Sequence, residues 1–230
     1  MSNILWQRLG AASGIVFVLV LVAPDLIQGG PSEDFTMTAA EQMAQSCATL
    51  TAARLTDAIY PITHVLGYLI FLFFLGSLWS ALRRAEGGDG WLSAAAFGGG
   101  LVFLALRFSG SAISGGGVHN SCAGIDPQLW QVLHDGAGVA IFTSFFPLAV
   151  LLAACAVVAI RFGAPLPRWL GWMSAVVAVA LLVDGFAGTL YHREFAPSAL
   201  LFVVWTLAAS IVLMRRAGQT LPTVESAHRD

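Results

Sequence analysis

Six long stretches of the chain are almost continuously apolar, and each is long enough to cross a lipid bilayer. The bilayer core is about 30 Å thick, which a helix spans with roughly 20 apolar residues. Because lipid offers no partner to an open strand edge, stretches of this kind must be helical. The sequence therefore predicts an all-α bundle of six transmembrane helices in one domain, residues 1–217. The expected spans are Leu5–Pro24, Ala58–Leu82, Trp91–Ser114, Gln131–Ile160, Trp169–Leu190 and Ala196–Met214.

Composition supports this assignment and excludes two other classes of protein. The 230 residues are 57% hydrophobic and 10% charged, with a mean hydropathy of +0.79. A soluble domain is about 25% charged, and a disordered chain combines high charge with few large apolar residues. The net charge of −2 provides no field that would attract nucleic acid. The expected partners are therefore the lipid bilayer and, in an accessory role, another membrane protein.

Arginines are distributed unequally over the segments that join the spans. With the N-terminus inside, eight arginines face the cytoplasm and only Arg54 and Arg193 face outward. The excess of basic residues on cytoplasmic loops predicts a protein of the cytoplasmic membrane with both termini inside. The outer loops are then residues 25–57, 115–130 and 191–195, and residues 218–230 are predicted to be a disordered inner tail. We expect the first span to be retained, because Pro24 stands where a signal-peptide cleavage site would lie.

Two of the three cysteines lie on these outer loops. Cys47 belongs to the first outer loop and Cys122 to the second, where the compartment permits disulfides. The sequence therefore predicts a Cys47–Cys122 bridge, with two free thiols as the alternative. Cys155 lies within the fourth span and is expected to pack as a small apolar residue.

The first outer loop contains a segment that is typical of a helix. Residues 36–57 lack glycine and proline and are rich in Ala, Met, Gln and Leu, which favour helix formation. We expect this helix to cap the outer end of the bundle, with a docking face for a partner as the alternative. Its expected packing face combines Met37, Ala40, Met43, Ala44 and Cys47 at helical spacing. The second outer loop is glycine-rich and is expected to be irregular up to about Pro127.

Five ionisable residues in or near the spans are candidates for a functional site. They are His64, Arg107, His134, Asp135 and Asp184, and ionisable side chains inside a membrane are costly enough to suggest a function by default. Counted from the expected outer ends of their spans, all five fall at similar depths near the outer face. The sequence therefore predicts one outward-facing polar cluster that is contributed by four helices.

Several roles for this cluster are open from the sequence. Arg107 and Asp184 could form an ion pair while His64 bonds to His134 or Asp135, or Arg107 could extend to the outer surface. The cluster could instead be a pocket that binds a small anion or an amphiphile on Arg107, or a path that moves protons through Asp184 and the histidines. Finally, His64 and His134 could be ligands of a b-type haem or of a single metal ion, although no cofactor is predicted.

One part of the chain resembles a known family. The segment LPRWLGW, residues 166–172, follows an apolar helix that contains FPLAV, and the turn RRAEGGDGW precedes both. In these features residues 50–185 resemble an actinobacterial family of six-helix membrane proteins without an assigned activity. The resemblance implies a fold and a location only. His64 and Arg107 are not part of the family pattern.

No motif of an established enzyme class is present, since the chain lacks GxSxG, HExxH, CxxC, Walker A and dinucleotide-binding signatures. We therefore expect a non-enzymatic integral membrane protein with a binding or accessory role. The first alternative is a transporter of small solutes, including a proton-coupled one. The second is a redox subunit that holds haem or a metal. No internal repeat between the two halves of the chain, of the kind found in many transporters, is evident.

Overall fold

The structure is all-helical, as the sequence predicts. The computed structural model describes residues 3–28, 38–51, 55–163, 165–191 and 197–217. These residues form eight helices, in which α5 and α6 are interrupted only at Ser144 and together make one apolar stretch. Six helical stretches are long and apolar enough to cross a membrane, which fits the six predicted spans. The helices are α1 (Asn3–Gln28), α2 (Ala39–Thr51), α3 (Leu55–Glu86), α4 (Trp91–Asn120), α5 (Pro127–Thr143), α6 (Phe145–Phe162), α7 (Arg168–Tyr191) and α8 (Pro197–Arg216).

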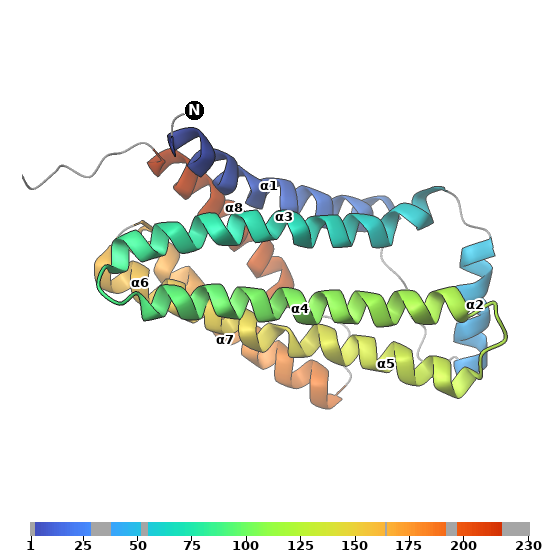
Figure 1. The fold of residues 1–230 in the computed structure, drawn as a ribbon. Coiled ribbons are helices and arrows are strands. Elements are labelled where there is room, and N and C mark those ends of the chain that lie inside the picture. The colour runs from blue at the N-terminus through green and yellow to red at the C-terminus, as the bar shows by residue number, and fades with distance from the viewer. Residues whose placement is uncertain (1–2, 29–37, 52–54, 164, 192–196, 218–230) are drawn as a thin grey trace, which may run out of the picture.

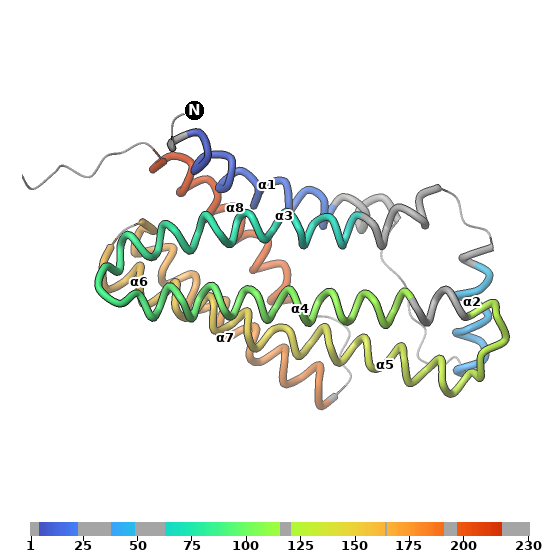
Figure 2. Tube along the Cα trace, viewed as in Figure 1, coloured from blue at the N-terminus to red at the C-terminus, as the bar shows by residue number. Residues whose placement is uncertain are grey.

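The long helices form a closed bundle in which neighbours in sequence are neighbours in space (Figure 1). Helix α3 packs on α1 and α4, α4 packs on α5 and α6, and α6 packs on α7. Helix α8 closes the bundle by packing on both α7 and α1. The trace in Figure 2 shows the α3–α4 and α6–α7 turns at the end of the bundle where α1 begins and α8 ends, with α2 at the opposite end. We call the end with these two turns the inner end and the end with α2 the outer end.

Aromatic side chains fill the centre of the bundle. The Phe71 ring lies 4.8 Å from that of Phe17, 5.8 Å from that of Phe103 and 5.9 Å from that of Phe202, centroid to centroid. This cluster joins α1, α3, α4 and α8, and each aromatic pair contributes about 0.5–1.5 kcal/mol beyond the area it buries. Trp205 extends the cluster toward α7, where its indole Nε1 donates a hydrogen bond of 2.7 Å to Ser174 Oγ.

Glycines allow α4 to approach its neighbours closely. A Cβ at Gly99 would lie 2.6 Å from the Pro147 carbonyl oxygen of α6, and a Cβ at Gly100 would lie 2.5 Å from the Leu75 side chain of α3. Small residues at contacts of this kind bring helix backbones together where lipid provides no hydrophobic driving force between helices.

The turn at the inner end between α3 and α4 is built from polar contacts. The Glu86 carboxylate accepts hydrogen bonds from the backbone N–H groups of Leu92 and Ser93, at 2.9 and 2.8 Å. These N–H groups belong to the first turn of α4 and have no partner within the helix. Gly90 has a φ of 65°, a conformation that glycine adopts without strain.

Helix α5 begins at Pro127, where the sequence predicts the irregular segment to end, although the predicted outer loop extends to residue 130. Other predicted boundaries at the outer end are wrong. Helix α4 continues to Asn120, so residues 115–120 are helical and not part of a loop, and α1 runs to Gln28 and α3 begins at Leu55, inside the predicted loop 25–57. Asp126 caps α5 by accepting from the N–H groups of Gln128 and Leu129. The helix predicted over residues 36–57 is shorter, because α2 ends at Thr51 and α3 begins at Leu55. The low helix propensity of the glycine run led to the prediction of a loop. Helix α4 packs on α2, and tertiary contacts can outweigh propensity.

Other predictions fall on residues whose structure is not described. These are residues 29–37 and 52–54 of the loop 25–57, the loop 191–195 beyond Tyr191, and the tail 218–230.

Candidate functional site

The five candidate residues do not form one cluster, because they lie at different heights in the bundle. At 1.5 Å per helical residue, Arg107 lies about 24 Å along α4 from the inner end, and Asp184 lies about 24 Å along α7. His64 lies about 33 Å along α3, and His134 and Asp135 lie about 40 Å from the inner end of α6. The expectation of a common depth is therefore wrong. It failed because α3, α4 and α5 extend beyond the predicted ends of their spans.

Arg107 faces the aromatic centre of the bundle. Its guanidinium carbon lies 5.5 Å from the centroid of the Phe103 ring and 5.4 Å from that of Phe145 on α6. The side chain is half-buried, and its buried Nε has no hydrogen-bond partner. No carboxylate among the described residues forms an ion pair with it. The cation is thus held by two aromatic faces, an interaction worth about 0.5–2 kcal/mol, and its charge is not neutralised by another side chain.

Asp184 does not contact Arg107 and instead forms a hydrogen bond to α8. Its side chain is 7% exposed, and its Oδ2 accepts a hydrogen bond of 2.9 Å from the backbone N–H of Ser198. Ser198 is the second residue of α8, whose first-turn N–H groups need partners from outside the helix. A carboxylate there is also favoured by the positive end of the helix dipole. Asp184 therefore caps α8 from the adjacent helix.

An ion pair between Arg107 and Asp184, one of the roles that the sequence left open, is absent among the described residues, to which both belong. Helices α4 and α7 each pack on α5 and α6, which lie between them. Equal height along two helices does not bring two side chains together when a third element separates the helices.

His64 lies on α3 at the end of a row of three rings. The His64 and Tyr68 rings meet edge to face at 6.4 Å, and the Tyr68 ring meets that of Phe108 on α4 at 5.7 Å. Tyr68 is buried, while His64 is half-buried. This row of rings connects α3 to α4 at Phe108, the residue after Arg107.

His134 and Asp135 belong to a separate unit at the outer end. We call this unit the outer head and define it as α2 together with residues 112–135, which are the end of α4, the turn after it and the beginning of α5. The His134 ring stacks on the Trp130 ring at 5.1 Å with an interplanar angle of 14°. Trp130 is buried, whereas Asp135 is exposed. The stack fixes His134 within the head and away from Arg107.

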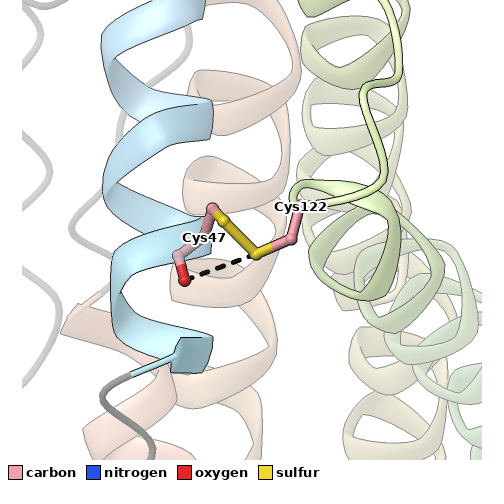
Figure 3. Close-up of a disulfide and its surroundings, with 2 residues drawn as sticks. All are labelled: Cys47 and Cys122. Carbon is pink, nitrogen blue, oxygen red and sulfur yellow. Dashed lines mark hydrogen bonds between the residues drawn. A yellow bond between two sulfur atoms is a disulfide. The ribbon is translucent and has the colours of Figure 1, made fainter.

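A disulfide ties the outer head together (Figure 3). The Cys47 and Cys122 sulfur atoms are 2.04 Å apart, as the sequence predicts. The bridge joins α2 to the turn that follows α4, and α2 packs on both α5 and α4. Its packing face differs in part from the expected one. Met43 and Cys47 are half-buried, but Ala40 and Ala44 are exposed, and Met37 lies outside the described residues.

The beginning of α2 carries a capping box that the sequence analysis did not single out. The Glu41 carboxylate accepts hydrogen bonds from the Thr38 backbone N–H at 2.7 Å and from the Thr38 hydroxyl at 2.8 Å. The Glu41 N–H donates in return to Thr38 Oγ1 at 3.4 Å. The bonds from Thr38 lower the pKa of the Glu41 carboxyl below its ordinary value. The T-x-x-E spacing is a sequence signature of such a box.

His64 and His134 lie on different helices and contact different rings. Helix α3 packs chiefly on α1 and α4, and α5 packs chiefly on α4, α2 and α7, while His64 meets Tyr68 and His134 stacks on Trp130. Within the described ranges no group of three or more His, Cys, Asp and Glu side chains has a spacing that could hold a metal ion.

Two cavities lie away from all five candidate residues. One, of about 410 Å³, lies between α1 and α3 near the inner end and is lined in part by Ser13, Ser77 and Ser80. The other, of about 540 Å³, lies between α6 and α7 and is lined by apolar side chains and by Arg161.

Three contacts of the candidate residues were missed by the sequence analysis, although two have a sequence signal. Phe103 and Trp130 stand four residues before Arg107 and His134, a spacing that places side chains on one helix face. The third, between Asp184 and Ser198, joins separate helices and has no local signal.

Comparison with family models, curated proteins and solved structures finds no match to this chain.

Proposed function

We propose that the protein is a multi-pass protein of the cytoplasmic membrane, with both termini inside and the outer head outside. The excess of arginines on the segments at the inner end supports this orientation. The disulfide supports it independently, because disulfides persist in an oxidising compartment and are rare in the cytoplasm. The six apolar helical stretches support the membrane location. The resemblance to an actinobacterial six-helix membrane family is consistent with it and implies no activity.

Within this location the protein acts as a non-enzymatic binding protein, and Arg107 is its anion-binding residue. The observation that carries this proposal is the state of the Arg107 side chain, a half-buried cation with two aromatic neighbours, an unpartnered Nε and no ion-paired carboxylate. A positively charged side chain at this depth in a bilayer needs an opposite charge or oxygen atoms that accept its hydrogen bonds. A small anion, or the carboxylate or phosphate of an amphiphile, supplies both.

The geometry favours binding over proton transport. Proton movement through the cluster would need Asp184 and the histidines to face one another. Asp184 instead bonds to the beginning of α8, and His134 stacks on Trp130 in the outer head.

The test measures binding of anionic amphiphiles to the full chain in a neutral detergent. Dodecyl phosphate should raise the midpoint of thermal unfolding of the wild type, because a ligand that binds the folded state stabilises it, whereas dodecyltrimethylammonium should not. Arg107→Leu should abolish the effect and Arg107→Lys should retain part of it. Arg84→Leu, which removes an exposed arginine at the inner end of α3, is the control. An unchanged response of Arg107→Leu would refute the proposal.

An accessory role is a second candidate that one observation favours. Leu129 and Val132 on α5 are 51% and 65% exposed, and they lie about 45–50 Å from the inner end of α6, beyond a bilayer core of about 30 Å. Exposed apolar side chains in the outer head favour contact with another membrane protein. Co-purification of a stoichiometric partner that Val132→Glu releases, while Asp135→Asn does not, would support this role.

A further inference from the structure

The cavity between α6 and α7 is an apolar groove with an arginine at one end, and it lies away from Arg107. Its floor is formed by alanines of both helices, with Ala149, Ala153 and Ala156 on α6 and Ala175 and Ala178 on α7. The alanines of α6 lie at four- and three-residue spacing on one helix face. Larger side chains form the rim, among them Val150, Val157, Val179 and Leu182, all exposed on the outside of the bundle. The result is a lipid-facing groove of about 540 Å³.

The groove runs from the inner end toward the middle of the bundle. Ala149 and Arg161 mark its limits on α6, and the 12 residues between them correspond to about 18 Å of helix. One leaflet of a bilayer core is about 15 Å thick, half of about 30 Å. The groove therefore has the length of one acyl chain of an inner-leaflet lipid, and it is shorter than a crossing helix.

The inner end of the groove is positively charged. Arg161 is the one charged residue that lines the cavity, and the exposed Arg168 begins α7 after the short α6–α7 turn. The sequence contains no acidic residue between Asp135 and Asp184. In the part of the chain that the structure describes, neither arginine forms an ion pair, and the Arg161 guanidinium lies 5.8 Å over the Phe162 ring. Both cations are available to a phosphate.

Two exposed tryptophans near the start of α7 indicate that these arginines lie at the depth of the lipid headgroups. Trp169 and Trp172 are 54% and 63% exposed near the start of α7, and tryptophan is enriched where the bilayer meets water. Basic pockets between transmembrane helices on the cytoplasmic side bind anionic lipid headgroups. An apolar groove that ends at Arg161, with a second exposed arginine at the start of the adjoining helix, matches both the acyl chain and the headgroup of an anionic phospholipid.

We propose that the groove between α6 and α7 is a binding site for one anionic phospholipid of the inner leaflet. One acyl chain lies on the alanine floor, and the phosphate binds Arg161 and Arg168. This inference rests on the proposed orientation in the membrane, but it is independent of the proposed role of Arg107, which lies on another helix and faces the centre of the bundle.

Native mass spectrometry of the full chain tests the proposal with two lipids that have the same acyl chains, phosphatidylglycerol and phosphatidylcholine. The wild type should retain one phosphatidylglycerol in preference to phosphatidylcholine. Arg161→Gln should weaken phosphatidylglycerol binding about fivefold, the effect of one arginine near a charged headgroup, and leave phosphatidylcholine binding unchanged. Arg84→Gln, a charge-matched change at the inner end of α3, should have no effect on either lipid.

A second pair of variants tests the groove itself. Ala153→Phe should fill the floor and reduce the binding of both lipids, whereas Ala105→Phe, on the exposed face of α4, should reduce neither. If Ala153→Phe does not fold, Arg161→Glu replaces it and should reverse the preference between the lipids. Equal binding of both lipids by the wild type and Arg161→Gln would overturn the proposal. Efficient cross-linking of Ala153→Cys to a second copy would also overturn it, because a helix would then occupy the groove.

Discussion

The body of the bundle and the outer head are stabilised in different ways. In the body, aromatic rings from α1, α3, α4 and α8 meet at the centre, and glycines such as Gly99 allow backbones to approach closely. In the outer head, a disulfide and a capping box hold α2, a helix of 13 residues. A helix of this length is marginal in isolation.

The difference follows from the two surroundings that we propose. Inside a membrane the helices gain little from burying apolar surface against each other, because lipid is equally apolar, so close packing decides their arrangement. A small unit in water lacks a core large enough for stability and needs covalent or capping support. Changes to the head should therefore act locally, and changes to the packed glycines should act on the whole bundle.

The largest effect is expected on removing the disulfide with Cys47→Ala and Cys122→Ala together. A disulfide contributes about 2–4 kcal/mol, so amide hydrogen exchange in α2 should rise by about 30-fold or more, while α6 and α7 keep their protection. Cys155→Ala, which removes the free buried cysteine, is the control and should leave α2 protected. An equal rise throughout the bundle would show that the head and the body unfold as one unit.

A smaller effect on the whole bundle is expected from Gly99→Ala. The new methyl group would meet the Pro147 carbonyl oxygen at 2.6 Å, and overpacking of this kind costs about 1–3 kcal/mol. The neighbouring Gly98→Ala is the matched control, because nothing lies within 4 Å of its Cβ position. The comparison is made by thermal unfolding in detergent, where Gly99→Ala should lower the midpoint and Gly98→Ala should not. Similar midpoints for the two variants would contradict the close approach of α4 and α6.

Two substitutions of Asp184 test whether this polar residue in the body of the bundle stabilises the fold. Asp184→Asn keeps an oxygen that can accept from the Ser198 N–H and should retain most of the stability. Asp184→Leu leaves that N–H without a partner and should cost about 1–3 kcal/mol. Chemical-denaturant unfolding distinguishes the two variants. If Asn is as damaging as Leu, the negative charge of Asp184 matters for more than the cap.

The smallest effect is expected at the capping box of α2. The pKa of Glu41 is lowered in the folded protein, so the stabilisation by its ionised form is present above the ordinary pKa and is lost as the pH falls through the folded value. Hydrogen exchange at the beginning of α2, corrected for the intrinsic pH dependence of exchange, should therefore increase in acid. Glu41→Gln should remove this pH dependence. A pH dependence that survives in Glu41→Gln would have to arise from another group.

The candidate residues show which parts of a site can be read from a sequence. Their chemical types and their positions on helices were evident, and so was the pairing of Cys47 with Cys122. Their grouping was not. It depended on outer span ends predicted at Ser114 and Gln131, whereas α4 ends at Asn120 and α5 begins at Pro127, and on an assumption that residues of equal depth meet. The structure separates Arg107 from Asp184 and both from His134.

The sequence by itself determined that the chain is helical and has six apolar stretches, because a continuous apolar run needs no knowledge of its neighbours. It also determined the cysteine pair, since only two cysteines lie outside the spans. Only the tertiary structure decided that Arg107 contacts Phe145, that Asp184 caps α8 and that a groove opens between α6 and α7. These depend on which helices are adjacent and which faces meet. Those choices are made by contacts between residues far apart in the chain, such as those of Phe71 with Phe202, and no local pattern records them.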